Sequence, residues 1–240
     1  MKRFAVFDID GTVIRWQLYH AIVDELGNRG LLAPGVHQKI NEARMTWKSR
    51  SHTKSFEDYE HTLVEAYHQA LTNLRVEDYD KAVDAVFETY KDQVYTYSRD
   101  LIKQLKSEGY LLFIVSGSQQ EIIQKLGNYY GFDEVVGTQY DQKNGRFTGN
   151  YQLVYGHKAE IVTELMQRHK VSTSGSVAIG DSGSDIAMLE LVERPIAFNP
   201  TKGLLDHAKR NGWEVVIERK NVVYQLRKTD GQQYVLAETN

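Results

Sequence analysis

The hydrophobic residues of this chain fall into short continuous runs, and most of these runs are separated by stretches with helical spacing. Continuous apolar runs are typical of strands that are covered on both faces of a sheet. They predict strands at Phe4–Phe7, Tyr110–Val115, Ser176–Ile179, Pro195–Phe198 and Trp213–Ile217.

Helical spacing recurs between these predicted strands. Apolar positions repeat every three or four residues at Leu101, Ile102 and Leu105, at Ile122, Ile123, Leu126 and Tyr130, and at Ile161, Val162, Leu165 and Met166. Ser98 could cap the first of these helices, and Gly109 could end it. Strands that alternate with helices predict an α/β fold, with a Rossmann-like parallel sheet core and helices on both faces.

The region from Arg15 to about Tyr97 contains no convincing strand and repeats a helical pattern instead. Leu18, Ile22 and Leu26 mark one helix. Ser55 and Asp58 resemble a capping box at the start of a second, and the apolar face continues through two helices as far as Tyr90. We therefore predict an α-helical cap domain that is inserted after the first strand.

The predicted domains are a core of residues 1–14 plus 97–220, a helical cap of residues 15–96, and a C-terminal β-hairpin extension of residues 221–240. Asn144-Gly145 predicts a hairpin turn within the core, and Asp230-Gly231 predicts one in the extension.

Composition narrows the class of protein. The chain has 240 residues, of which 41% are hydrophobic and 25% charged, as is ordinary for a globular protein. The net charge of −3 gives no support to nucleic-acid binding, and the absence of cysteine excludes disulfides and thiolate chemistry. The short apolar run after Met1 predicts neither a signal peptide nor a membrane span, so we expect a cytoplasmic protein with no membrane partner.

Polar residues follow three of the predicted strands. Asp8 and Asp10 follow the first, Ser116-Gly117-Ser118 the second, and Asp181 with Asp185 the third. The carboxyl ends of parallel strands share one edge of a sheet, where ligands bind. These residues are therefore expected to meet in space.

Such a meeting point could carry out phosphoryl chemistry. Crowded carboxylates need a hard cation, and ligands with oxygen alone suit Mg²⁺. One carboxylate can attack phosphorus, and a second can serve as general acid. Ser116 and nearby backbone N–H groups can hold phosphoryl oxygens, with Ser116 also expected to cap a helix. Lys158 supplies a positive charge, although Lys143 and Arg146 are alternatives.

Four segments resemble the four motifs of the haloacid-dehalogenase-like hydrolases, specifically the C1-capped, phosphoserine-phosphatase-like subgroup. They are Phe7-Asp8-Ile9-Asp10-Gly11-Thr12-Val13, Ile114-Val115-Ser116-Gly117-Ser118, Lys158 and Gly180-Asp181-Ser182-Gly183-Ser184-Asp185. The hairpin segment around Asn144 and Ala197-Phe198-Asn199-Pro200 resemble the subgroup further. The resemblance covers roughly residues 1–217.

The resemblance implies a role for each residue. Asp8 would be the nucleophile, and Asp10 the general acid and then the general base. Asp8, Asp181 and the backbone carbonyl of Asp10 would bind Mg²⁺. Ser116 and Gly117 would hold phosphate, and Lys158 would bind phosphate and orient the nucleophile. Asp185 would support Lys158 or a metal-bound water. The implied partner is a small phosphorylated metabolite.

The chain departs from the subgroup at Gln17. Phosphoserine phosphatases carry a glutamate nine residues after the nucleophile that reads the ammonium group of the substrate. A neutral amide cannot pair with an ammonium as a carboxylate does. We therefore predict that phosphoserine is a poor substrate, unless another cap residue such as Glu25 or Glu42 supplies the charge.

Three alternatives remain open at this stage. The first is a phosphoryl-accepting switch, which would not need Asp10. The second is a phosphotransferase or mutase on the same fold. The third is a binding module without catalysis, which would not need all four carboxylates.

Overall fold

The computed structural model describes residues 2–50, 52, 55–72, 74–229 and 234–239. The chain divides into two compact units. The sheet unit comprises Met1–Gln17, Tyr90–Thr138 and Leu153–Asn240, and the insert unit comprises Leu18–Thr89 and Gln139–Gln152.

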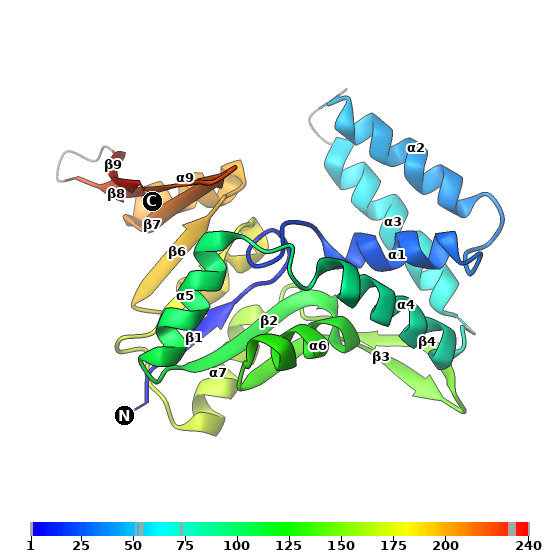
Figure 1. Ribbon diagram of the computed structural model, residues 1–240, viewed down its shortest axis with the longest axis horizontal. Helices are drawn as coiled ribbons and strands as arrows, with labels where there is room; N and C mark the ends of the chain where they lie inside the picture. The colour runs from blue at the N-terminus through cyan, green and yellow to red at the C-terminus, as the bar shows by residue number, and fades with distance from the viewer. Residues whose placement is uncertain (1, 51, 53–54, 73, 230–233, 240) are drawn as a thin grey trace. The chain divides into compact units, whose positions relative to one another are not determined.

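The sheet unit is built on parallel strands, as the apolar runs predicted (Figure 1). β1 (Phe4–Phe7) lies between β2 (Leu111–Gln119) and β5 (Val177–Gly180) and is parallel to both. β3 (Glu134–Lys143) pairs with β2 on one side, and β6 (Arg194–Phe198) and β7 (Glu214–Arg219) continue the sheet on the other. β8 (Val222–Lys228) and β9 (Tyr234–Thr239) extend it antiparallel beyond β7.

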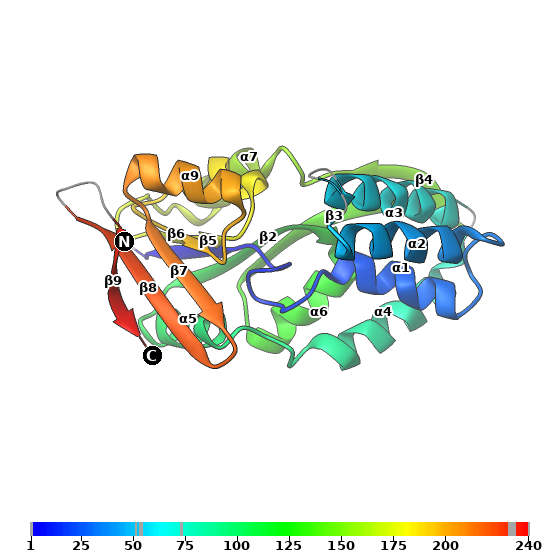
Figure 2. The same cartoon turned by 90° about the horizontal axis from the view of Figure 1, so that it is seen from above.

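Helices cover both faces of this sheet, which confirms the predicted fold class. α5 (Thr96–Ser107) and α6 (Gln120–Tyr130) lie on one face, and α7 (Lys158–His169) and α9 (Lys202–Asn211) lie on the other (Figure 2). Side chains alternate across a strand, so β1 contributes to both cores. Phe4 and Val6 pack in the α7 and α9 core, whereas Phe7 contacts Phe132 just after α6.

The insert unit contains four helices and a hairpin. The helices are α1 (Leu18–Asn28), α2 (Val36–Lys48), α3 (Ser55–Leu71) and α4 (Val76–Tyr90). The distal part of β3 pairs antiparallel with β4 (Arg146–Gln152). Asn144 and Gly145 both have positive φ, at 51° and 72°, as the predicted Asn-Gly turn requires.

The two units differ from the predicted domains at their boundaries, which fall after residues 17 and 89, in the C-terminal extension, which belongs to the sheet unit, and at residues 139–152. Residues 139–152 were predicted as part of the core, but they pack with the helices of the insert unit. The cause is aromatic packing that the helical period does not reveal. Phe147 of β4 meets Tyr79 edge to face, with ring centroids 4.9 Å apart, and Tyr140 meets Tyr67 in the same way.

Two local predictions also need correction. α5 begins at Thr96, so Ser98 lies inside its first turn and does not cap it. The buried Ser98 hydroxyl donates instead to the carbonyl oxygen of Thr12. The N–H groups of Thr96 and Tyr97 donate to the carboxylate of Glu218, which therefore caps this helix from β7.

The C-terminal extension forms the predicted pair of strands, β8 and β9, and they join the main sheet. The predicted turn at Asp230-Gly231 lies outside the described residues. In the part of the chain that the structure describes, no helix is both long and apolar enough to span a membrane.

Candidate active site

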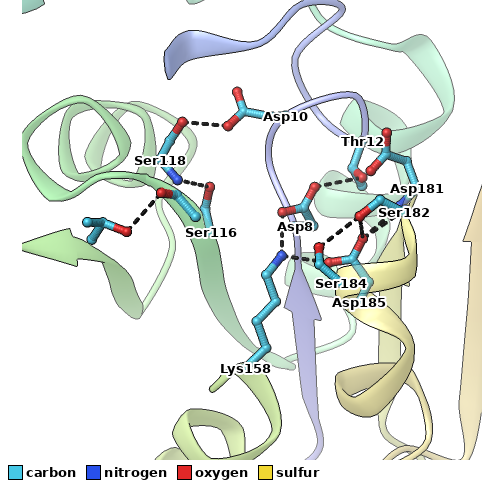
Figure 3. Close-up of polar contacts among 12 residues, drawn as sticks. Asp8, Asp10, Thr12, Ser116, Ser118, Lys158, Asp181, Ser182, Ser184 and Asp185 are labelled. Atoms are coloured by element: carbon cyan, nitrogen blue, oxygen red, sulfur yellow. Dashed lines mark hydrogen bonds and ion pairs between the residues drawn. The ribbon is translucent and has the colours of Figure 1, made fainter. Parts of the chain in front are cut away.

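Asp8 and Asp10 lie where β1 ends and the chain turns. The Asp8 N–H still donates to the carbonyl of Ile179 in β5, so Asp8 is held at the edge of the sheet. The next residues curl around the carbonyl oxygen of Ile9, which accepts hydrogen bonds from the N–H groups of Val13 and Ile14. The two carboxylates are thus carried on a short, internally bonded loop (Figure 3).

Lys158 bridges two carboxylates at the start of α7. Its ammonium group donates to Asp8 Oδ1 at 2.7 Å and to Asp185 Oδ1 at 2.6 Å. All three side chains are buried. Of the cations considered from the sequence, Lys158 is the one that joins Asp8, whereas Lys143 and Arg146 are exposed residues of the β3–β4 hairpin.

Asp185 is fixed by the turn that follows β5. Its Oδ2 accepts hydrogen bonds from the backbone N–H groups of Asp181 and Ser182 and from the Ser182 hydroxyl. Both Asp185 oxygens are therefore engaged, one by this turn and one by Lys158. Asp185 holds the Asp181 loop and the ammonium group in a fixed relation.

Two glycines allow the loops to approach each other. A Cβ on Gly11 would lie 2.2 Å from Asp181 Oδ2, and Gly11 also has a positive φ of 76°. A Cβ on Gly180 would lie 2.6 Å from the side chain of Asp185. Any side chain at either position would displace a carboxylate, which gives a physical reason for both glycines.

The serines of β2 adjoin the same edge. The sequence predicted that Ser116 and Ser118 follow the second strand. In the structure β2 continues to Gln119, so both serines lie within the strand. The register with β3 shifts between Val115 and Gln119. Ser116 Oγ accepts a hydrogen bond from the Ser118 N–H, and α6 begins only at Gln120, so Ser116 does not cap that helix.

Burial and like charge shift the acidic groups strongly. Burial raises the pKa of Asp8 to about 7, because the stabilising charge of Lys158 only partly offsets desolvation and the nearby Asp185 and Asp10. Burial and the neighbouring Asp8 and Asp185 raise the pKa of Asp181 to about 9. Burial alone would lower the pKa of Lys158, but Asp185 and Asp8 raise it above its ordinary value.

Burial is the main cause of the raised pKa values of Asp8 and Asp181, and the neighbouring carboxylates add to it in a site that holds one ammonium group. Oxygen atoms of Asp8, Asp181 and Asp185 lie within 4.8 Å of one another. A cluster of carboxylate oxygens without nitrogen or sulfur ligands fits a hard divalent cation such as Mg²⁺. Asp185 is fully buried, and its Oδ2 accepts three hydrogen bonds besides the Lys158 contact of its Oδ1, so Asp8 and Asp181 are the carboxylates with more room for a cation.

Hydrogen bonds around the cluster involve residues to which the sequence analysis gave no role. The Thr12 hydroxyl donates to Asp8 Oδ2 at 3.0 Å, and the Ser118 hydroxyl donates to Asp10 Oδ2 at 2.5 Å. Thr12 and Ser118 are part of the quoted motifs, so position in a motif was the available signal.

Gln17 is partly buried and ends the first segment of the sheet unit, directly before α1.

The fold and this site define a hydrolase class, and comparison with known proteins identifies it. The family described as haloacid dehalogenase-like hydrolase matches residues 5–190. This chain belongs to that family.

Relatives of the chain include two that are named as phosphatases. It is 27% identical over 210 residues to a phosphoserine phosphatase from Archaeoglobus fulgidus, covering 86% of this chain but 55% of that protein. It is 26% identical over 234 residues to a histidinol-phosphatase from Neisseria meningitidis, covering 90% of this chain and 99% of that protein. The chain thus spans about half the length of the first relative and nearly all of the second.

Solved structures show the same fold. A protein of unknown function from Bordetella pertussis superposes with a TM-score of 0.73 at 21% identity, covering 91% of this chain and 99% of that one. A substrate-bound phosphoserine phosphatase superposes with a TM-score of 0.65 at 21% identity, covering 92% and 95%. At this identity the likeness concerns the fold, which is phosphoserine-phosphatase-like.

Proposed function

We propose that this chain is a Mg²⁺-dependent phosphatase that hydrolyses a small phosphomonoester through an aspartyl-phosphate on Asp8. The observation that carries the proposal is the buried contact between Lys158 and Asp8, set among carboxylates at the edge of the sheet. Perturbed pKa values in a cluster of this kind are typical of catalytic groups.

The first step joins Asp8 to the phosphoryl group. An Asp8 carboxylate oxygen forms a bond to phosphorus, and the bond from phosphorus to the substrate alcohol breaks. Asp10 gives its proton to the departing alcohol oxygen. Lys158 and Thr12 each hold one Asp8 oxygen, which limits the orientations that the nucleophile can adopt.

The second step returns Asp8 to its free form. Asp10, now ionised, takes a proton from a water molecule whose oxygen attacks phosphorus. The bond between phosphorus and Asp8 breaks, and inorganic phosphate leaves. Ser116 and Gly117 would hold phosphoryl oxygens in both steps. The Ser118 N–H occupies an acceptor site on Ser116 Oγ, which leaves the Ser116 hydroxyl proton for donation to phosphate.

Mg²⁺ would be held by Asp8, Asp181 and the backbone carbonyl of Asp10. Bound there, it would neutralise charge between the carboxylates and the phosphoryl oxygens. The raised pKa values of Asp8 and Asp181 support this part of the proposal, since burial and the neighbouring carboxylates both disfavour the charged forms that a cation would stabilise. Asp185 would keep Lys158 and the Asp181 loop in place.

The substrate is a small phosphorylated metabolite, and Gln17 argues against phosphoserine. The relatives in hand bear the names of two different phosphatases, so their names do not select a substrate. A neutral amide in place of a carboxylate removes one charge-assisted hydrogen bond to an ammonium group. Such a bond is worth about 1.5–3 kcal/mol, or roughly ten- to a hundredfold in specificity.

The test is a panel of phosphomonoesters that includes phosphoserine, histidinol phosphate and p-nitrophenyl phosphate, assayed with Mg²⁺ for release of inorganic phosphate. Gln17→Glu should raise kcat/KM for phosphoserine relative to an uncharged monoester, whereas the neutral control Gln17→Met should not. Release of phosphate from no member of the panel would contradict the proposed function. Transfer of phosphate to an organic acceptor would favour a phosphotransferase.

A further inference from the structure

The hydroxyl of Ser118 makes a contact that the proposed reaction does not yet use. Ser118 Oγ donates to Asp10 Oδ2 at 2.5 Å, and the Ser118 side chain is almost fully buried (Figure 3). We infer that Ser118 is a positioning residue that orients the Asp10 carboxyl toward the leaving-group oxygen. The inference deepens the proposed function and rests on the role proposed there for Asp10.

Asp10 lies on a loop, where a side-chain contact can fix the orientation of its carboxyl group. It lies beyond the end of β1, on a loop whose hydrogen bonds are made by backbone groups around Ile9. Those bonds fix the path of the chain but not the two side-chain torsions of Asp10. A proton is transferred over hydrogen-bond distance, so the carboxyl must be held within a narrow range of orientations.

Ser118 is well anchored for this purpose. Its backbone N–H donates to Ser116 Oγ at 3.1 Å. The adjoining carbonyl of Gly117 accepts a hydrogen bond from the Thr138 hydroxyl of β3 at 2.8 Å. The segment from Ser116 to Ser118 is therefore tied both to itself and to the neighbouring strand. A hydroxyl on such a segment is a fixed donor, not a mobile one.

The same contacts connect phosphate binding with proton transfer. Ser116, which is proposed to bind phosphate, accepts from Ser118, and Ser118 donates to Asp10. With Oδ2 held by Ser118, the Asp10 carboxyl would turn its other oxygen toward the leaving group. Loss of the Ser118 hydroxyl should therefore impair the departure of an alcohol more than the binding of phosphate.

Two substrates with different leaving groups separate these effects. An alkyl monoester releases a poor leaving group that needs a proton as its bond breaks, whereas p-nitrophenyl phosphate releases a stable phenolate that does not. The measurement is kcat/KM, which includes leaving-group departure but not the later hydrolysis of the aspartyl-phosphate. The alkyl monoester used in this test is the member of the phosphomonoester panel, among those with an alkyl leaving group, that the unaltered protein hydrolyses fastest.

We expect Ser118→Ala to lower kcat/KM for the alkyl monoester by about tenfold or more, and for p-nitrophenyl phosphate by less than about threefold. Because both substrates are assayed on one preparation, any unfolded fraction cancels in the ratio. Ser118→Thr, which keeps a hydroxyl, should return the ratio toward that of the unaltered protein.

Thr138→Val is the matched control, since it removes a buried hydroxyl that bonds the same segment but not Asp10. It should change both substrates by a similar factor. A ratio that Ser118→Ala leaves unchanged would overturn the inference while the proposed function stood. If the unaltered protein hydrolysed neither substrate, the proposed function itself would fail.

Discussion

Both units of the molecule contain a network of charged and polar side chains, but the charges are buried around Lys158 and only half-buried in the insert unit, and they balance differently. In the sheet unit, three carboxylates of Asp8, Asp181 and Asp185 gather around the one ammonium group of Lys158. In the insert unit, Asp24 pairs with Arg44 at 2.6 Å, and Arg44 also donates to the Tyr59 hydroxyl at 2.8 Å. The Tyr59 hydroxyl in turn lies 3.4 Å from Nδ1 of His20.

The network of the insert unit is satisfied from end to end. Arg44 can only donate, so the Tyr59 oxygen accepts from it, and the same hydroxyl shares a hydrogen bond with His20 Nδ1 whose direction follows the tautomer of His20. Burial, then the charge of Arg44, lowers the pKa of His20 and favours its neutral form, while the charge of Arg44 is paired with that of Asp24. The cluster of the sheet unit instead gathers three carboxylates around one ammonium group, which costs stability and is typical of the catalytic role proposed for it. The comparison shows that the two networks differ in charge balance as well as in burial, and that the imbalance falls at the proposed active site.

The largest expected effect is the loss of the nucleophile. Asp8→Asn keeps the size of the side chain but removes the carboxylate that would attack phosphorus. We expect phosphatase activity to fall on the order of 10⁴-fold or more and no covalent phosphoprotein to form. Activity and acid-quenched labelling with a ³²P-phosphomonoester are the measurements, and near-native turnover by this variant would refute the assigned role.

The next effect concerns proton transfer. Asp10→Asn should reduce turnover by ~10²–10⁴-fold, because an amide can neither give nor take the proton. Since only the backbone carbonyl of Asp10 is proposed to bind the cation, the variant should retain its Mg²⁺ affinity. Calorimetric titration with Mg²⁺ tests that, and loss of binding would assign the Asp10 side chain to the metal.

A smaller effect concerns the insert unit, where the protonation of His20 should make the free energy of unfolding depend on pH. Burial, then the charge of Arg44, lowers the pKa of His20 to about 4. Between that value and an ordinary pKa near 6.5, the unfolded chain binds more protons than the folded one, so stability is full above about pH 6.5 and is lost as pH falls towards 4. The loss attributable to His20 reaches on the order of 3 kcal/mol.

His20→Asn replaces the imidazole with an amide that can still hydrogen-bond to the Tyr59 hydroxyl but cannot titrate. Urea unfolding of the variant and the unaltered chain at pH 4.5 and pH 7 measures the difference. We expect the variant to lose less stability on acidification. An identical pH dependence in both would show that His20 is not the group responsible.

The smallest effect is the stability that a cation adds. The pKa values of Asp8 and Asp181 are raised, so the folded chain binds protons that the unfolded chain has released, and metal-free stability falls as pH rises from about 4 towards 7–9. Mg²⁺ at about 100 times its Kd should restore about 2.7 kcal/mol. Thermal unfolding at pH 8 with Mg²⁺, against a sodium salt of equal ionic strength, measures this.

Asp181→Asn is the matched variant for this experiment. It removes one proposed ligand and one buried charge together, so the metal-free form should be more stable than the unaltered protein at pH 8. Mg²⁺ should then stabilise it less. Equal stabilisation of both proteins by Mg²⁺ would exclude Asp181 as a ligand.

Much of the sheet unit could be predicted from sequence, because its signals are local. A continuous apolar run such as Phe4–Phe7 has few structures open to it other than a buried strand. The parallel order of such strands then brings Asp8, Ser116 and Asp181 to one edge. The Asn144-Gly145 turn was equally local, since its positive φ values suit few other residue pairs.

The predictions that failed depended on contacts between segments distant in sequence. Ser98 fits the start of a helix, but Glu218, 122 residues away from Thr96, supplies the capping oxygens from β7. Residues 139–152 read as part of the core, because nothing in their own pattern reveals that Phe147 packs on Tyr79. Helical and strand periods report which face is buried, not which partner buries it.

The sequence by itself determined that strands alternate with helices and that the acidic residues lie at one edge of the sheet. It also determined that a metal site would have no thiolate ligand, because the chain has no cysteine. Only the tertiary structure decided which cation joins Asp8, that Ser118 holds Asp10, and that both oxygens of Asp185 are already taken. The physical reason is range. Local propensity acts over a few residues, whereas a hydrogen bond at 2.5–3.0 Å depends on the placement of backbones that meet only after the chain has folded.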